Sequence, residues 1–274
     1  MAKGRSSSII RNRTQRSMNF ESFSSFFIAA AVGLASGAIG AFIILKRMAL
    51  VGDALSHVAL PGIALALNYS LDPFWGVLLF LLTAAMIVWW LEGHTSLPGD
   101  ALVGLLFTTS LAIGVLAIPN AEIIHSLFGE FPALSPFALG ITVILALGAA
   151  AMVFRFARQF VFRTTMSELA GVHRFGRRFD LLLLLLFALI VSLGIKLVGT
   201  LLMGALTIIP ASIAKNLATS MKAFLLLSTL LGGIISVAGL LIAQMFVFLP
   251  GPSIILFGVA MFLISLAFPR YGPS

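Results

Sequence analysis

Residues 181–195 read LLLLLLFALIVSLGI, a run that contains no charged side chain. The chain has few polar residues with which to cover such a run: 60% of its 274 residues are hydrophobic and only 9% are charged. A soluble globular domain carries about 25% charged residues. The mean hydropathy is +1.14. This composition excludes a soluble enzyme, a coiled coil and a disordered chain, and it predicts a helical membrane protein with several spans.

Apolar runs recur on both sides of this stretch, at 23–45, 50–69, 74–91, 101–118, 136–154, 179–197, 199–216, 223–247 and 252–268. As one helix, 179–216 would be about 57 Å long, too long for one crossing of a bilayer. Because Lys196, Gly199, Gly204 and Pro210 interrupt it, we expect two segments, or one span and a broken half-helix. The predicted fold is all-α, a polytopic transmembrane bundle of eight or nine membrane segments.

The basic residues indicate membrane topology rather than nucleic-acid binding, because they lie in short breaks between the apolar runs. The net charge is +8, and the break 155–178 holds six arginines with Glu168 as its one acid. The positive-inside rule places this break in the cytoplasm. Counting spans from it puts Lys46, Arg47, Lys215, Lys222 and Arg270 inside and Asp72, Glu122 and Glu130 outside. The same count places the basic tail 1–20 outside, against the rule.

The first apolar run is too long for the core of a signal peptide, so we expect a retained span. We therefore expect one transmembrane domain over 21–270, preceded by the tail 1–20. The chain has no cysteine, which excludes disulfides, thiolate metal sites and cysteine nucleophiles.

Residues 52–62 read GDALSHVALPG and place a carboxylate and an imidazole inside an apolar segment. An ionisable residue at membrane depth costs a few kcal/mol on insertion scales, so it indicates function by default. Asp53 and His57 are four residues apart and therefore share one helix face, with Ser56 beside them. One oxygen ligand and one nitrogen ligand on one face form half of a site for a divalent first-row metal.

Two residues after His57 add to this pattern. Pro61 has no N–H, so the carbonyl of residue 57 loses its usual partner and is free to bind a metal, bind water or mark a kink. Gly62 permits another backbone to approach closely. From the residues alone, a hydrogen bond between Asp53 and His57 that ties helices together explains the pair equally well.

The stretch 46–62, KRMALVGDALSHVALPG, resembles the signature of the metal-transporting ABC permeases. These are membrane subunits that import zinc, manganese or iron(II). Three other stretches are similar to the same family: SLFG with LSP within 126–136, an external loop; ELAGV at 168–172, a cytoplasmic coupling segment; and KLVGTLLMGALTIIPA at 196–211. The resemblance covers about residues 40–268.

This resemblance implies an ABC importer permease that works as a homodimer in the cytoplasmic membrane of a prokaryote, with the translocation path between the two copies. Asp53 and His57 would be transient metal ligands, and Ser56, Pro61 and Gly62 would line the path or form a kink. The transported ion would be zinc, manganese or iron(II), and no cofactor would be bound permanently. An extracytoplasmic metal-binding protein would deliver the ion.

The energy source is expected on another chain, because the sequence contains no Gly-x-x-x-x-Gly-Lys-[Ser/Thr] phosphate-binding loop. The chain itself is therefore predicted not to be an enzyme. The family resemblance assigns docking of a partner ATPase to Glu168, Leu169, Ala170, Gly171 and Val172 in the cytoplasmic segment 155–178. By composition alone, the same segment is a solvated loop.

The sequence leaves open how the external loop and the Asp53 and His57 pair function. Glu122, His125 and Glu130 either attract cations at an external metal entry or form an ordinary acidic loop. The main alternative function is a stand-alone ion- or proton-coupled transporter that uses Asp53 and His57 as a relay. A third possible function is a membrane scaffold in which this pair only ties helices together. In that case, mutating the pair would lower stability without changing metal specificity.

Overall fold

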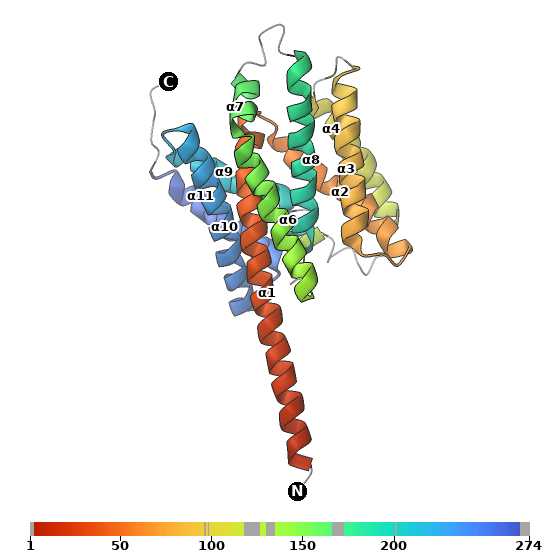
Figure 1. Ribbon diagram of the computed structural model, residues 1–274, viewed down its shortest axis with the longest axis vertical. Helices are drawn as coiled ribbons and strands as arrows, with labels where there is room; N and C mark the ends of the chain where they lie inside the picture. Colours follow the sequence, from red (N-terminus) through yellow and green to blue (C-terminus); the bar gives the residue numbers. More distant parts are fainter. Residues whose placement is uncertain are drawn as a thin grey trace.

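Each predicted apolar run forms a helix, and the residues described in this computed structural model contain no β-strand (Figure 1). The structure describes residues 3–95, 97, 99–117, 127–129, 135–165, 173–200 and 202–268. The helices are α1 (Lys3–Leu45), α2 (Ala49–Asn68), α3 (Pro73–Glu92), α4 (Gly99–Ala117), α6 (Pro136–Arg155), α7 (Ala157–Thr165), α8 (His173–Val198), α9 (Met203–Leu217), α10 (Met221–Phe246) and α11 (Pro250–Ser265). The predicted all-α bundle is confirmed.

Five described helical segments are long and apolar enough to cross a membrane, by length and composition: Ser24–Leu45, Pro73–Glu92, Pro136–Arg155, Arg178–Val198 and Met221–Phe246. Shorter apolar helices cover Ala54–Asn68, Ala101–Gly114 and Pro250–Ser265. The sequence did not predict α7 as a separate helix, because the arginines within 155–165 mask its apolar side.

Helix boundaries follow from local chemistry. The Asp72 carboxylate accepts a hydrogen bond from the Phe74 N–H at 2.8 Å, and Pro73 occupies the first turn of α3. Gly199 has a φ of +85° directly after the end of α8. Glycine adopts this left-handed conformation without steric cost, so it ends helices readily. The stretch 179–216 therefore forms two helices, as expected.

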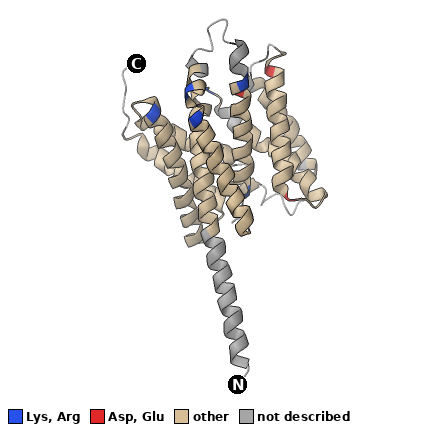
Figure 2. Cartoon of the chain, in the orientation of Figure 1, with Lys and Arg blue, Asp and Glu red and all other residues tan. Residues whose placement is uncertain are grey.

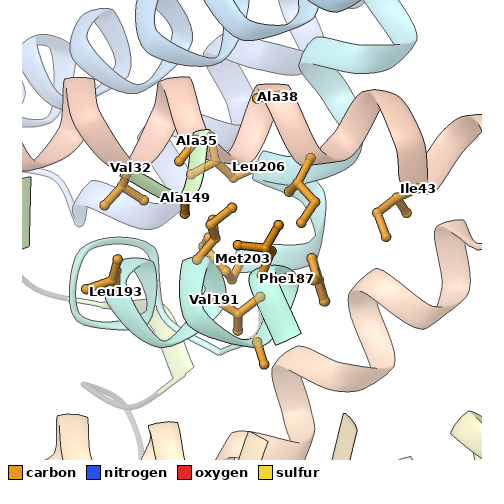
Figure 3. Packing of buried hydrophobic residues seen from close by; sticks show 14 of the residues in the cluster. Val32, Ala35, Ala38, Ile43, Ala149, Phe187, Val191, Leu193, Met203 and Leu206 are labelled. Atoms are coloured by element: carbon orange, nitrogen blue, oxygen red, sulfur yellow. The ribbon is translucent and has the colours of Figure 1, made fainter. Parts of the chain in front are cut away.

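The core lies where α1, α8, α9 and α10 meet. Figure 3 shows Val32 and Ala35 of α1 facing a cluster that includes Val191 of α8 and Met203 of α9. On another side of α1, a Cβ on Gly37 would overlap the backbone carbonyl of Ser228 in α10. Small residues permit this close approach, which is how helices associate in a membrane without a hydrophobic driving force between them.

The basic residues are distributed unequally between the two ends of the bundle. Figure 2 shows most of the described Lys and Arg residues gathered at the end where α1 finishes and α8 begins. We call it the basic end. Between the ends, α3, α4 and α6 expose large apolar side chains, such as Leu79, which is 69% exposed, and Ile144, which is 70% exposed. An apolar belt with cations at one end agrees with the predicted membrane topology.

Two ion pairs connect α8 to the loops on either side of α2. At the basic end, the Lys46 ammonium pairs with Asp180, and each side chain is only 16% exposed. At the other end, Lys196 Nζ lies 3.1 Å from Asp72 Oδ1, in a pair that is more open to solvent. These pairs join residues 134 and 124 positions apart in sequence. They hold α8 alongside both ends of the helix that carries His57.

Exchanging the partners at the basic end tests this connection. Asp180→Lys alone places two cations together, and we expect it to lower the free energy of unfolding by about 1–3 kcal/mol. The double variant Lys46→Asp/Asp180→Lys should recover much of that loss, as measured by heat-induced unfolding of the purified protein. Lys196→Glu is the matched control: it places two carboxylates together at the other end, and it is expected to cost less than about 1 kcal/mol because the pair with Asp72 is exposed. Equal losses in the single and double variants would show that the pair itself contributes nothing.

Candidate metal site on helix α2

The middle of α2 is enclosed by the rest of the protein. Every residue from 55 to 64 is buried, and α2 packs against α3, α4 and α9. A helix that is apolar and buried on all sides belongs in the interior of a protein rather than at its lipid surface. Any ionisable residue on this part of α2 is therefore held away from both lipid and bulk water.

His57 lies in this enclosed part, about 12 Å along α2 from Ala49 at 1.5 Å per residue. Its side chain is 6% exposed. The Phe107 ring of α4 packs edge-on against the imidazole, with the centroids 5.1 Å apart and the planes at 68°. This aromatic contact fixes the ring orientation and closes the site on the α4 side.

Asp53 belongs to the same uninterrupted helix, one turn before His57. At 3.6 residues per turn, a spacing of four places the two positions on one face of α2. Ser56, beside His57, is fully buried. Among the side chains that the structure describes, no group of three or more His, Asp or Glu is placed to hold a metal ion. The face shared by Asp53 and His57 is the candidate site.

Close backbone contacts hold α2 just beyond His57. Pro61 lies inside the helix, which continues to Asn68, so the carbonyl of residue 57 lacks its usual N–H partner. A Cβ on Gly62 would lie 2.5 Å from the Gly76 carbonyl oxygen of α3, and one on Gly114 of α4 would lie 2.6 Å from the Leu60 Cβ. The close approach predicted at Gly62 is present, and α2 is pressed between α3 and α4.

A short segment covers this region on the side away from the basic end. Leu127 packs on a small cluster formed by Leu60 and Ala64 of α2. Gly129, at φ +75°, sits so close to the α8–α9 break that an added Cβ would lie 2.5 Å from the Leu197 carbonyl oxygen. The sequence motif at 126–129 did not reveal this cover. The signal that marks it is the pair Gly129 and Gly199, which both need positive φ.

A comparison with protein families matches residues 20–269 to the ABC 3 transport family. The chain belongs to the ABC 3 transport family. This membership confirms the resemblance to metal-transporting ABC permeases, and it makes the chain a multi-pass permease of the plasma membrane.

Its curated relatives include two metal permeases. The chain is 34% identical over 242 residues to the manganese import system permease protein ScaB of Streptococcus gordonii, covering 86% of this chain and 87% of the relative. It is 27% identical over 253 residues to the high-affinity zinc uptake system membrane protein ZnuB of Haemophilus influenzae, covering 89% of this chain and 96% of the relative.

A solved structure of PsaBC from Streptococcus pneumoniae in complex with Fab has the same fold. The TM-score is 0.75 and the sequence identity is 32%, over 90% of this chain and 91% of that one. The relatives and the solved structure thus match this ABC 3 permease over nearly its whole length.

Several predicted residues of this ABC 3 permease lie outside the described part of the chain. These are the candidate entry residues Glu122, His125 and Glu130 and the candidate coupling residues Glu168, Leu169, Ala170, Gly171 and Val172. The coupling residues lie between α7, which ends at Thr165, and α8, which begins at His173. Both of those helix ends lie at the basic end (Figure 1).

Proposed function

We propose that this chain is the membrane-spanning subunit of an ATP-driven importer for manganese or zinc. The observation that carries the proposal is the spacing of Asp53 and His57 on one face of α2, with His57 enclosed, in an ABC 3 permease whose relatives are named for manganese and zinc transport. One carboxylate and one imidazole accept either ion, and iron(II) as well, because ligand type alone does not separate these metals.

The candidate site suits passage of a metal ion rather than its storage. The carboxylate of Asp53 supplies one ligand and an imidazole nitrogen of His57 a second, while water, the carbonyl freed by Pro61 or a second copy completes the coordination. An ion that must leave again needs coordination that is weak or short-lived. Two ligands from one chain meet this requirement, whereas a closed four-ligand cage would hold the ion.

His57 is closed off from solvent in this conformation. His57 is buried beneath Phe107, and Leu127 covers the neighbouring turn of α2. In this proposal, a metal reaches His57 when α4 or the segment 127–129 moves away from α2. Such opening and closing around a fixed site is the behaviour expected of alternating access.

The energy and the cargo come from partner chains in this proposal. Two copies form the translocation path, and an ATPase subunit docks at the basic end through Glu168, Leu169, Ala170, Gly171 and Val172. An extracytoplasmic metal-binding protein delivers the ion near Glu122, His125 and Glu130. Ser56, Pro61 and Gly62 line the path beside the ligands or form its kink.

Uptake of radioactive manganese and zinc into vesicles tests the energy source. The chain is reconstituted with its ATPase subunit and its metal-binding protein, and ATP is supplied on the ATPase side. We expect uptake to require hydrolysable ATP and to persist when an uncoupler removes the proton gradient. Uptake that continues without the ATPase and stops with the uncoupler would instead establish a stand-alone, gradient-driven transporter.

A further inference from the structure

An open pocket of about 450 Å³ lies at the basic end, between α7 and α10. Its walls are mainly apolar and come from both helices: Ala157, Val161, Phe162, Met221 and Leu225. Two cations, Arg158 of α7 and Lys222 of α10, also line it. The volume lies within the range of small-molecule sites in proteins, about 300–1,000 Å³. No part of the candidate metal site contributes to it.

The pocket lies beside the first two turns of α10, at one end of an apolar span. The apolar span of α10 begins at Met221 and has 26 residues, or about 39 Å at 1.5 Å per residue. The hydrocarbon layer is about 30 Å thick, so a span of this length either tilts or extends into the headgroup layer at one end. Lys222 is the one charged residue of α10, and for this reason we place the first turn in the headgroup layer. Lys222 lies in this first turn, and Leu225 lies one turn deeper, at the level of the acyl chains.

The two cations are available to a ligand. Both side chains are exposed. Among the side chains that the structure describes, neither cation forms an ion pair, whereas nearby Lys46 is paired with Asp180. Phe162 is 56% exposed beside them, so an apolar surface directly adjoins these two cations.

We propose that this pocket binds an anionic phospholipid of the cytoplasmic leaflet. The phosphate lies between the Arg158 guanidinium and the Lys222 ammonium. The part of an acyl chain nearest the headgroup follows the apolar wall toward Leu225. Basic pockets between transmembrane helices on the cytoplasmic side recognise anionic headgroups in this way. A soluble partner protein fits less well, because the apolar wall continues one turn into the span. This site is independent of the identity of the transported metal.

Titration of the purified full-length chain with lipid, followed by native mass spectrometry, tests the charge requirement. The probes are phosphatidylglycerol and phosphatidylcholine with identical acyl chains. A basic residue near the membrane surface contributes about 1 kcal/mol, so Arg158→Gln/Lys222→Gln should weaken phosphatidylglycerol binding about thirtyfold. The matched control is Arg155→Gln/Lys215→Gln, which removes two exposed cations from the same end outside the pocket. We expect it to weaken binding less than about threefold.

Two further measurements make the result specific to a lipid. Ala157→Trp fills the pocket while keeping both cations, and we expect it to weaken phosphatidylglycerol binding as strongly as the double charge variant. Soluble glycerol phosphate should fail to compete at millimolar concentration. Equal losses in the two double variants, equal affinity for both lipids, or competition by glycerol phosphate would overturn the proposal. So would Arg158→Gln/Lys222→Gln binding lipid normally but failing to bind the ATPase subunit, because the pocket would then be a protein docking site.

Discussion

His57→Gln and Asp53→Asn are each expected to lower manganese or zinc uptake at least about a hundredfold while the chain stays folded in the membrane. Changes in the groups that merely orient metal ligands already cost about 10–100-fold in affinity or activity, so removing one of two protein ligands costs more. Both substitutions approximately conserve volume, and neither introduces a new charge. Uptake per folded transporter is the measurement, with membrane content determined for each variant.

His94→Gln is the matched control for this prediction. It makes the same substitution at an exposed histidine that contacts the Trp90 carbonyl oxygen at 2.7 Å and stacks on the Trp90 ring. We expect it to transport normally. If instead His57→Gln unfolds the chain and uptake falls only in proportion to the folded protein that remains, the pair is a tie between helices and the ligand assignment is wrong.

A cysteine at position 57 sharpens the same test. Thiolate is a good ligand for zinc but a poor one for manganese, which prefers harder oxygen donors. His57→Cys should therefore retain much more zinc uptake than manganese uptake. A purely structural role for His57 predicts equal loss of both ions.

The helices could be predicted from the sequence because each apolar run is a local signal. All nine runs became helices, and the interruption at Gly199 separates α8 from α9 as expected. The helix α7 was missed because its arginines conceal the side that carries Phe160, which is 2% exposed and packs in the core. Local composition cannot show that a short basic helix is anchored by one aromatic residue.

The candidate site was predictable only as a helix face. The spacing of Asp53 and His57 gives their common face, but nothing near them in sequence indicates that Phe107 covers the imidazole or that Leu127 covers Leu60. These contacts join residues 50 and 67 positions apart, and they depend on how α4 and the segment 127–129 fold back onto α2. Such long-range contacts leave no local pattern in a single sequence from which they could be predicted.

Gly199→Val is expected to lower the free energy of unfolding by about 2–6 kcal/mol. A β-branched side chain at φ +85° costs about 1–3 kcal/mol in backbone strain. An added Cβ would also overlap the Leu127 carbonyl oxygen, and overpacking typically costs another 1–3 kcal/mol. Heat-induced unfolding of the purified chain is the measurement. Gly148→Val is the matched control, because a Cβ there meets no atom within 4 Å, and it should cost less than about 1 kcal/mol.

The same glycine tests whether the segment 127–129 acts as a cover over α2. Gly129 and Gly199 touch through their backbones, so each alanine substitution pushes the same two chain segments apart. Residues in contact show coupling energies of about 0.5–3 kcal/mol in double-mutant cycles, whereas distant residues add independently. Gly129→Ala and Gly199→Ala should therefore be non-additive by at least about 0.5 kcal/mol. Strict additivity would mean that the two substitutions do not act on a shared contact, and the proposed cover over α2 would then lose its support.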